Sequence, residues 1–124
     1  MTAKTKAPTR LELVSAMIEE QGLTKEELIG YLRQVMEIRA LENNIANLLS
    51  KAVLKGASHL YAGQEAVSVG AVAALRDDDL ITSTHRGHGH AHAHGDKFAK
   101  TPQAKQEHYN KMMAEVLGKS GGYC

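Results

Sequence analysis

Large apolar side chains are scarce in this sequence. It has no tryptophan and one phenylalanine, and leucine, isoleucine, valine and phenylalanine together make up about a fifth of its 124 residues. Chains with less than roughly a fifth of such residues usually remain disordered, and aromatic side chains dominate the buried area of ordinary cores. The length allows one small domain, so we expect a loosely packed unit that depends on a partner.

Cysteine pairs and long apolar runs are also missing. The only cysteine is Cys124, which excludes an internal disulfide and fits a reducing compartment. No apolar run approaches the roughly 18 residues that a membrane span needs, and no apolar stretch of a targeting signal follows Lys4, Lys6 and Arg10. We therefore expect a cytoplasmic protein without membrane contact, whose residues 1–9 form a flexible N-terminal arm.

The charge is almost balanced. Fifteen lysines and arginines face fourteen aspartates and glutamates, which leaves a formal net charge of +1. So small an excess creates no field that would attract a polyanion. We therefore expect no nucleic-acid partner.

Four segments show helical signals, and in the first two of them apolar residues recur at helical spacing. Thr24 and Glu27 form a capping-box pattern in front of the longest segment, and Thr101 followed by Pro102 is a typical start of another. The four helices are expected at about 11–21, 25–55, 64–75 and 102–117.

The third of these segments is rich in small residues. Ala66, Gly70 and Ala74 recur every four positions, which predicts a buried helix whose small residues lie against another backbone. Residues 80–84 then suit a short strand. The expected fold class is mostly α, with about four helices and one short strand.

Five of the seven histidines lie between His85 and His94. Two pairs, His88 with His92 and His90 with His94, have the i, i+4 spacing that a helix would place on a single face. A metal site is therefore one interpretation of this segment. A second interpretation is a solvated polar loop without a role.

A third interpretation is a site for a phosphorylated cofactor. Gly87 and Gly89 allow a ligand to approach the backbone closely, and the planar guanidinium of Arg86 suits phosphate oxygens. The preceding helix and strand would point the segment at such a ligand. These residues alone leave the three interpretations open.

Several ordered motifs resemble one enzyme family. Residues 59–66 read His-Leu-Tyr-Ala-Gly-Gln-Glu-Ala, residues 79–90 read Asp-Leu-Ile-Thr-Ser-Thr-His-Arg-Gly-His-Gly-His, and residues 112–119 read Met-Met-Ala-Glu-Val-Leu-Gly-Lys. They are similar to the N-terminal part of the alpha subunits of thiamine diphosphate-dependent 2-oxo acid dehydrogenases, among which the pyruvate and acetoin enzymes are nearest. The resemblance runs from about Leu28 to the end of the sequence.

The resemblance implies that this chain is the N-terminal portion of an α/β fold that binds thiamine diphosphate. It also implies a heterotetramer with a beta subunit, Mg²⁺ beside the diphosphate, oxidative decarboxylation or cleavage of the substrate, and acyl transfer to a lipoyl group on an acyltransferase. By position, Arg86 and His85 correspond to residues that bind the cofactor's diphosphate. His59 and His88 correspond to histidines of the catalytic cavity, where imidazoles can move protons.

One part of the family pattern is absent. The Gly-Asp-Gly and Asn-Asn motif that supplies the family's magnesium ligands has no match, since Asn43-Asn44 lies too far upstream and Gly95-Asp96 lacks the second glycine. We therefore expect residues 10–124 to be an incomplete thiamine diphosphate-binding domain, truncated at its C-terminal end. Such a domain would carry no metal ligands and would be inactive alone.

An alternative from another class is a non-catalytic helical interaction module or a histidine-rich metal-binding module. Tight zinc binding that is lost in His90→Ala and His94→Ala would favour the metal-binding module. Self-association through the long helix is a further hypothesis.

The missing magnesium motif predicts that the isolated chain binds magnesium thiamine diphosphate weakly or not at all, because the metal that bridges protein and diphosphate has no ligands. Titration calorimetry should therefore show no micromolar binding. Such binding, or carbon dioxide release from pyruvate by the chain alone, would contradict the expectation of an incomplete domain.

Overall fold

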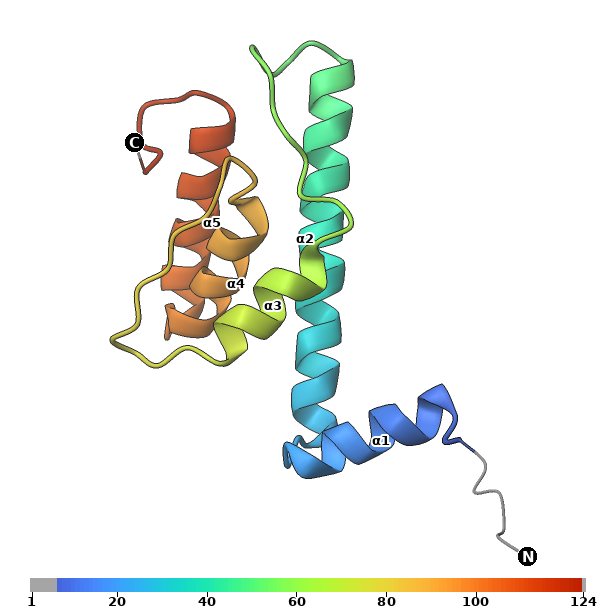
Figure 1. The fold of residues 1–124 in the computed structure, drawn as a ribbon. Helices are drawn as coiled ribbons and strands as arrows, with labels where there is room; N and C mark the ends of the chain where they lie inside the picture. Colours follow the sequence, from blue (N-terminus) through green and yellow to red (C-terminus); the bar gives the residue numbers. More distant parts are fainter. Residues whose placement is uncertain (1–6, 124) are drawn as a thin grey trace, which may run out of the picture. The chain divides into compact units, whose positions relative to one another are not determined.

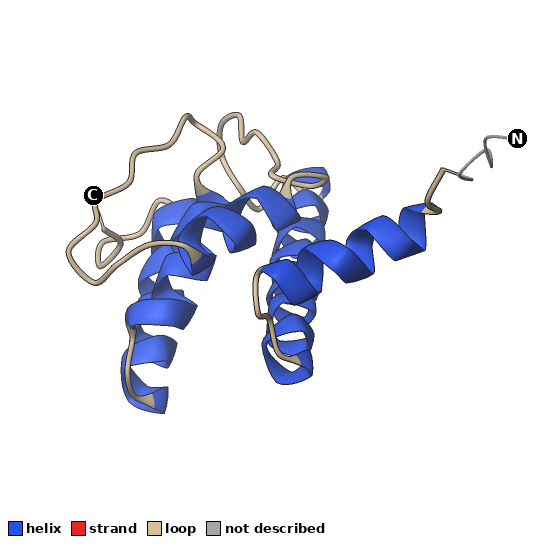
Figure 2. Cartoon of the chain, turned by 60° about the horizontal axis from the view of Figure 1, so that its bottom comes forward, coloured by secondary structure: helices blue, strands red, loops and turns tan. Residues whose placement is uncertain are grey.

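The computed structural model describes residues 7–123, which form five helices (Figure 1). They are α1 (Arg10–Glu20), α2 (Lys25–Ser50), α3 (Glu65–Ala73), α4 (His88–Phe98) and α5 (Pro102–Val116). No residue between 7 and 123 belongs to a strand (Figure 2). The prediction of a mostly helical chain is confirmed, with one helix more than expected. Within the same residues, no helix is both long and apolar enough to span a membrane.

The chain divides into an N-terminal unit that ends at Gly30 and a second unit that begins at Tyr31. In the first unit Thr9 caps α1, because its hydroxyl accepts a hydrogen bond from the Glu12 amide and its own amide donates to the Glu12 carboxylate at 2.6 Å. None of the α1 residues is buried. The predicted arm at residues 1–9 thus ends in a helix cap, and its first six residues lie outside the described part of the chain.

The predicted capping box starts α2. The Thr24 amide donates to the Glu27 carboxylate at 2.8 Å, and the Thr24 hydroxyl accepts a hydrogen bond from the Glu27 amide at 3.2 Å. The bonds from Thr24 lower the pKa of Glu27, which keeps a negative charge at the positive end of the helix. Local sequence therefore determines this helix start.

The end of α2 comes earlier than the apolar pattern predicts. The helix stops at Ser50 instead of about Lys55, because Ala52 adopts a left-handed φ of 52°. The amides of Ala52 and Val53 then donate to carbonyls in the last turn of the helix. This pattern satisfies carbonyls that the helix itself leaves unpaired.

The hydrophobic core of the second unit is small. Its buried members come from α2, the loop before α3, α3 itself and α4, and they are Ile38, Tyr61, Val69, Val72 and Ala93. Tyr61 is the largest of the fully buried side chains in the described chain. α3 packs against α4, and α4 packs against α5 (Figure 1). The thin core agrees with the composition.

α4 is the helix that the sequence analysis misses. Its buried glycines, Gly89 and Gly95, lie at contacts that leave no room for a side chain. A Cβ on Gly89 would overlap the ring of Tyr61, and a Cβ on Gly95 would overlap the ring of His108. Packing therefore requires these glycines, although glycines usually indicate a loop. The interpretation of the histidine segment as a solvated polar loop is wrong, because the segment is helical from His88 onward and partly buried.

Lys97 on α4 closes the C-terminal end of α3. Its ammonium group donates to the carbonyls of Val72, Ala73 and Leu75 at 2.9, 2.8 and 2.5 Å. The last carbonyls of a helix have no partner inside the helix, and they carry the negative end of its dipole. A single cation thus stabilises the end of α3 and joins it to α4.

The neighbouring Asp96 links α4 to two other helices. Its carboxylate accepts hydrogen bonds from Gln34 of α2 at 2.7 Å and from Lys105 of α5 at 2.6 Å. The Tyr109 hydroxyl donates to the same carboxylate at 3.4 Å, and burial together with this negative charge raises the pKa of Tyr109 to about 12. Polar contacts therefore supplement the small apolar core.

Contrary to the prediction, the small-residue strip of α3 does not lie against another backbone among residues 7–123. Ala66, Gly70 and Ala74 are exposed, and a Cβ on Gly70 would meet nothing within 4 Å. The helix instead buries its other face, which includes Ser68 and Val69.

The predicted strand at residues 80–84 does not form. Leu80 is 97% exposed, and the segment runs as an irregular loop. A strand is stabilised by hydrogen bonds to a neighbouring strand, and residues 7–123 supply no such neighbour. The β-branched composition alone therefore does not produce a strand here.

Gly89→Ala should destabilise the second unit, because the added methyl group must displace the Tyr61 ring in the core. We expect a loss of about 1–3 kcal/mol in the free energy of unfolding, measured by urea denaturation. Gly70→Ala is the control, since its methyl group meets open space within a helix and should add about 0.5–1 kcal/mol of stability. Equal effects of the two substitutions would show that close packing at Gly89 has no energetic importance.

Candidate functional site

The four residues predicted to act in catalysis or cofactor binding lie on or beside two loops of the second unit. His59 is in the loop between α2 and α3, and His85 and Arg86 are in the loop between α3 and α4. His88 is the first residue of α4. His88 is therefore positioned by the start of α4, whereas the other three residues depend on contacts made by the two loops.

His59 and His85 contact each other. Their rings meet edge to face, with centroids 4.5 Å apart and an interplanar angle of 65°. Both residues are exposed. The structure thus brings together one histidine predicted for the catalytic cavity and one predicted for the diphosphate, and both are accessible to a ligand.

Arg86 joins the two loops. Its Nη1 donates a hydrogen bond to the Leu60 carbonyl, next to His59 in the sequence, and its side chain is half-buried. Among residues 7–123, no acceptor binds its Nε or Nη2. The guanidinium is therefore held in place while part of its planar set of donors remains available for an anion.

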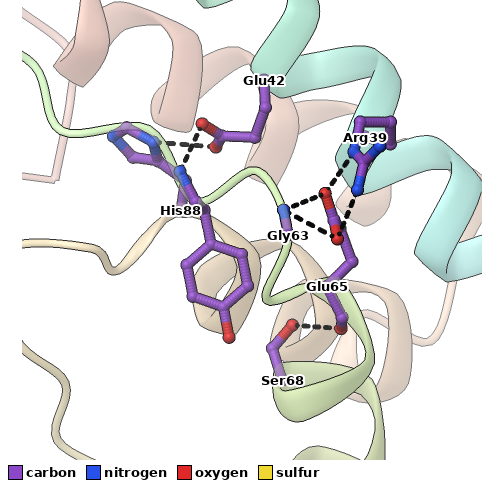
Figure 3. Close-up of polar contacts among 7 residues, drawn as sticks. Arg39, Glu42, Gly63, Glu65, Ser68 and His88 are labelled. Carbon is purple, nitrogen blue, oxygen red and sulfur yellow. Dashed lines mark hydrogen bonds and ion pairs between the residues drawn. The ribbon is translucent and has the colours of Figure 1, made fainter.

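A buried carboxylate that the sequence analysis misses holds His88. Glu42 of α2 is 0% exposed, and its two oxygens bind different groups (Figure 3). Oε1 lies 2.9 Å from Nδ1 of His88, and Oε2 accepts a hydrogen bond from the Tyr61 amide at 2.7 Å. The sequence does contain a signal, because Glu42 lies four residues after Ile38 and three before Ile45, in the stripe that α2 buries.

Glu65, the first residue of α3, is a second buried carboxylate. Nε and Nη2 of Arg39 donate to its oxygens at 2.5 and 3.0 Å, and the Gly63 amide donates to the same oxygens at 3.0 and 3.1 Å (Figure 3). The hydrogen bonds from Arg39 lower the pKa of Glu65 to about 2, although burial opposes this shift. In the sequence, Glu65 belongs to the motif at residues 59–66 without an assigned role, and no pattern points to Arg39.

Within the described chain, no hydrogen bond, ion pair or ring contact joins His88 to the other three predicted residues. Arg86 binds the carbonyl of Leu60, the residue after His59, and the His59 ring contacts the ring of His85. His88 is connected through Glu42 to the next residue's amide. Two adjacent backbone groups therefore link the two parts of the candidate site.

His88 also lines a cavity of about 400 Å³ with mainly apolar walls. Leu41, Ala91, Met112 and Met113 are among the other residues that line it. Nδ1 of His88 is engaged by the buried carboxylate, whereas Nε2 has no hydrogen-bond partner among residues 7–123. His88 thus lines a largely apolar cavity, while the Nδ1 side of its ring is held by Glu42.

The other histidines of α4 pack against aromatic rings. The pairs are His90 with Tyr61, His92 with Tyr109 and His94 with Phe98, whose ring centroids are 5.5, 4.9 and 4.5 Å apart. Burial lowers the pKa of His92, which favours its neutral form. Within the described chain, no group of three or more His, Cys, Asp or Glu side chains is arranged to hold a metal ion. The structure therefore gives no support to the metal-binding alternative.

Residues 33–122 match the sequence model of the family described as dehydrogenase E1 component. The chain belongs to this family. The E1 match includes the four predicted site residues, both buried carboxylates and Arg39, whereas α1 precedes it. The family resemblance drawn from the sequence motifs is confirmed.

This E1 chain is similar to the alpha subunit of acetoin:2,6-dichlorophenolindophenol oxidoreductase from two bacteria. The Bacillus subtilis protein is 43% identical over 106 residues, 86% of this chain and 28% of the relative; the Cupriavidus necator protein is 41% identical over 102 residues, 82% and 27%. The mitochondrial pyruvate dehydrogenase E1 component subunit alpha type I of Ascaris suum is 34% identical over 99 residues, 80% and 24%. The chain spans about a quarter of the length of these relatives. No solved structure matches it significantly.

Arg39→Ala should destabilise the second unit, because it leaves the buried carboxylate of Glu65 without its counterion. We expect a loss of about 1–3 kcal/mol in the free energy of unfolding near neutral pH, measured by urea denaturation. Arg33→Ala on the same helix breaks an exposed pair with Glu37 and should cost only about 0.3–0.5 kcal/mol. Similar losses in both variants would contradict a special role for the buried pair.

The carboxylate of Glu65 should also make the stability of the second unit depend on pH. The folded pKa of Glu65, about 2, lies below its ordinary value of 4.5, so its contribution is complete above about pH 4.5 and is lost as the pH falls toward 2. In Glu65→Gln this part of the pH dependence should disappear, which denaturation at several pH values can measure. An unchanged slope between those pH values would refute the assignment.

Proposed function

We propose that this chain is part of the alpha subunit of a thiamine diphosphate-dependent dehydrogenase that acts on pyruvate, another 2-oxo acid or acetoin. In this proposal it contributes the wall of the site that holds the cofactor's diphosphate. The names of the relatives support the enzyme class. The two acetoin relatives are more similar to this chain than the Ascaris pyruvate enzyme, which favours acetoin as the first substrate to test.

The arrangement of Arg86 is the observation that carries the proposal. Its guanidinium is fixed by the Leu60 carbonyl and has donors without an acceptor in the described chain. Arginine binds phosphate oxygens through two parallel N–H groups, and such charge-assisted bonds are about twice as strong as neutral ones. The exposed rings of His59 and His85 lie together in the same two loops. These residues therefore fit an anionic diphosphate.

Thiamine diphosphate, when bound, supplies the carbon nucleophile that attacks the substrate's carbonyl group. The residues of this chain have narrower tasks in the proposal. Arg86 neutralises the diphosphate, and His85 donates a hydrogen bond to it. His59 and His88 hold or move a proton near the reacting atoms, as imidazoles can do close to neutral pH. The proposal includes Mg²⁺ but assigns none of its ligands to residues 7–123.

We propose that other parts of the complete enzyme cover the exposed apolar side chains of this chain. Leu32, Met36 and Leu80 are 60%, 64% and 97% exposed, and in the proposal these side chains lie against other parts of the complete enzyme. In the proposal, residues 80–84 pair as a strand in a parallel sheet of an α/β domain of which residues 10–124 are one part. The partners are a beta subunit and a lipoyl-bearing acyltransferase, the location is the cytoplasm, and residues 1–9 are a flexible arm.

A hybrid enzyme tests the proposal. Residues 33–122 of this chain replace the matching segment of the Bacillus subtilis alpha subunit, and acetoin-dependent reduction of 2,6-dichlorophenolindophenol is measured in the assembled enzyme. The hybrid should be active. In the hybrid, Arg86→Ala should weaken cofactor binding by about 2 kcal/mol, which raises the half-saturating cofactor concentration about thirtyfold.

Arg76→Ala is the matched control for this substitution. Arg76 is also an arginine of the loop between α3 and α4, but it is exposed and pairs with Asp78 and Asp79. Its removal should leave the cofactor requirement unchanged. An inactive hybrid beside an active parent enzyme would refute the proposed function, and an unchanged requirement in Arg86→Ala would exclude that residue from the diphosphate site.

A further inference from the structure

The buried Glu42 has a further consequence for His88. We propose that Glu42 is a positioning residue that keeps His88 in one tautomer, with the proton on Nδ1 and a bare lone pair on Nε2. The inference about the tautomer depends on the geometry of this chain. Its importance for catalysis rests on the proposed function.

The two oxygens of Glu42 have different tasks. Oε2 is occupied by the Tyr61 amide, a donor that cannot change its role, at 2.7 Å. Oε1 lies 2.9 Å from Nδ1 of His88. The carboxylate is 0% exposed, so these contacts replace the water that a free carboxylate would bind.

Donor and acceptor rules then determine the tautomer. A carboxylate accepts hydrogen bonds and donates none, so a neutral imidazole that faces it must carry its proton on Nδ1. The remaining nitrogen, Nε2, has no partner among residues 7–123 and belongs to a side chain that lines the apolar cavity. Histidines that bind metals or protons are commonly oriented in this way by a carboxylate behind the ring.

The surrounding packing makes the arrangement rigid. Glu42 projects from the buried stripe of α2, and Tyr61, whose amide it binds, lies in the core against Gly89 of α4. His88 starts that same helix. The donor, the carboxylate and the ring are therefore each attached to a packed element, which is the arrangement that preserves a site's geometry.

Nuclear magnetic resonance on the unmodified 124-residue chain tests the tautomer directly. Two-bond proton–nitrogen correlations of the imidazole distinguish a protonated nitrogen from one with a lone pair, and they are recorded at about pH 9, where an imidazole is ordinarily neutral. We expect His88 to carry its proton on Nδ1. A proton on Nε2, or a mixture of both forms, would overturn the proposal without any variant.

Glu42→Gln provides a sharper test, because the expected result is a reversal. The fixed Tyr61 amide requires an oxygen, so the glutamine must turn its NH₂ group toward His88. Nδ1 then has to accept, and the proton should move to Nε2. Glu107→Gln is the control, since it removes the same charge at an exposed carboxylate on α5 that pairs with Lys111, and it should leave the tautomer unchanged. Retention of the Nδ1 proton in Glu42→Gln would contradict the proposal.

The hybrid enzyme tests the catalytic consequence. Glu42→Gln should lower kcat by about ten- to a hundredfold, as removal of an outer hydrogen-bond partner commonly does, with little change in the cofactor requirement. In a His88→Ala background the same substitution should have no further effect on kcat, because no ring remains to be oriented. An additional loss in the double variant would show a merely structural role. An inactive unmodified hybrid would refute the proposed function, whereas the resonance experiment would still decide the tautomer.

Discussion

Three backbone groups within residues 60–63 bind charged side chains, and the candidate site depends on this arrangement. The pairs are the Leu60 carbonyl with Arg86, the Tyr61 amide with Glu42 and the Gly63 amide with Glu65. A charged group can be buried only where fixed donors or acceptors replace its water. Gly63 has a φ of 95°, which side chains rarely tolerate, and this turn directs its amide to the carboxylate. The conformation of this loop and the placement of the charged side chains therefore depend on each other.

Polar contacts contribute much to holding the helices together, because the apolar core is small. Five buried residues form it, and they supply limited contact area between the helices. Lys97 holds the end of α3, and Asp96 joins α4 to α2 and α5. Contacts of this kind need particular geometry, whereas apolar contacts tolerate small shifts. The placement of the site is therefore determined more by hydrogen-bond directions than by packing volume.

Sequence predicts those features whose causes lie within a few residues. The start of α2 depends on Thr24 and Glu27, three residues apart, and it was predictable. The glycines of α4 are required by close contacts with Tyr61 and His108, which are distant in the sequence. No local pattern reveals these contacts, so the sequence did not predict this helix. The prediction of a strand at residues 80–84 was wrong because a strand needs hydrogen bonds to a neighbouring strand. The buried position of Glu42 could be read from the apolar stripe of α2, but its partners could not, and the roles of the motif residues remain predictions.

The histidine rings of the candidate site differ in how freely they can reorient, and this difference suits them to different chemical roles. His59 and His85 are exposed and contact each other, so a ligand can reorient both rings without breaking a buried bond. His88 cannot turn without leaving one oxygen of a buried carboxylate without its partner, which is far more costly than the loss of an exposed contact. Adaptable groups suit the binding of a charged ligand, whereas a proton-transfer group benefits from a fixed direction. Under the proposed function, we therefore infer that the direction of the His88 ring matters more for proton transfer than that of His59.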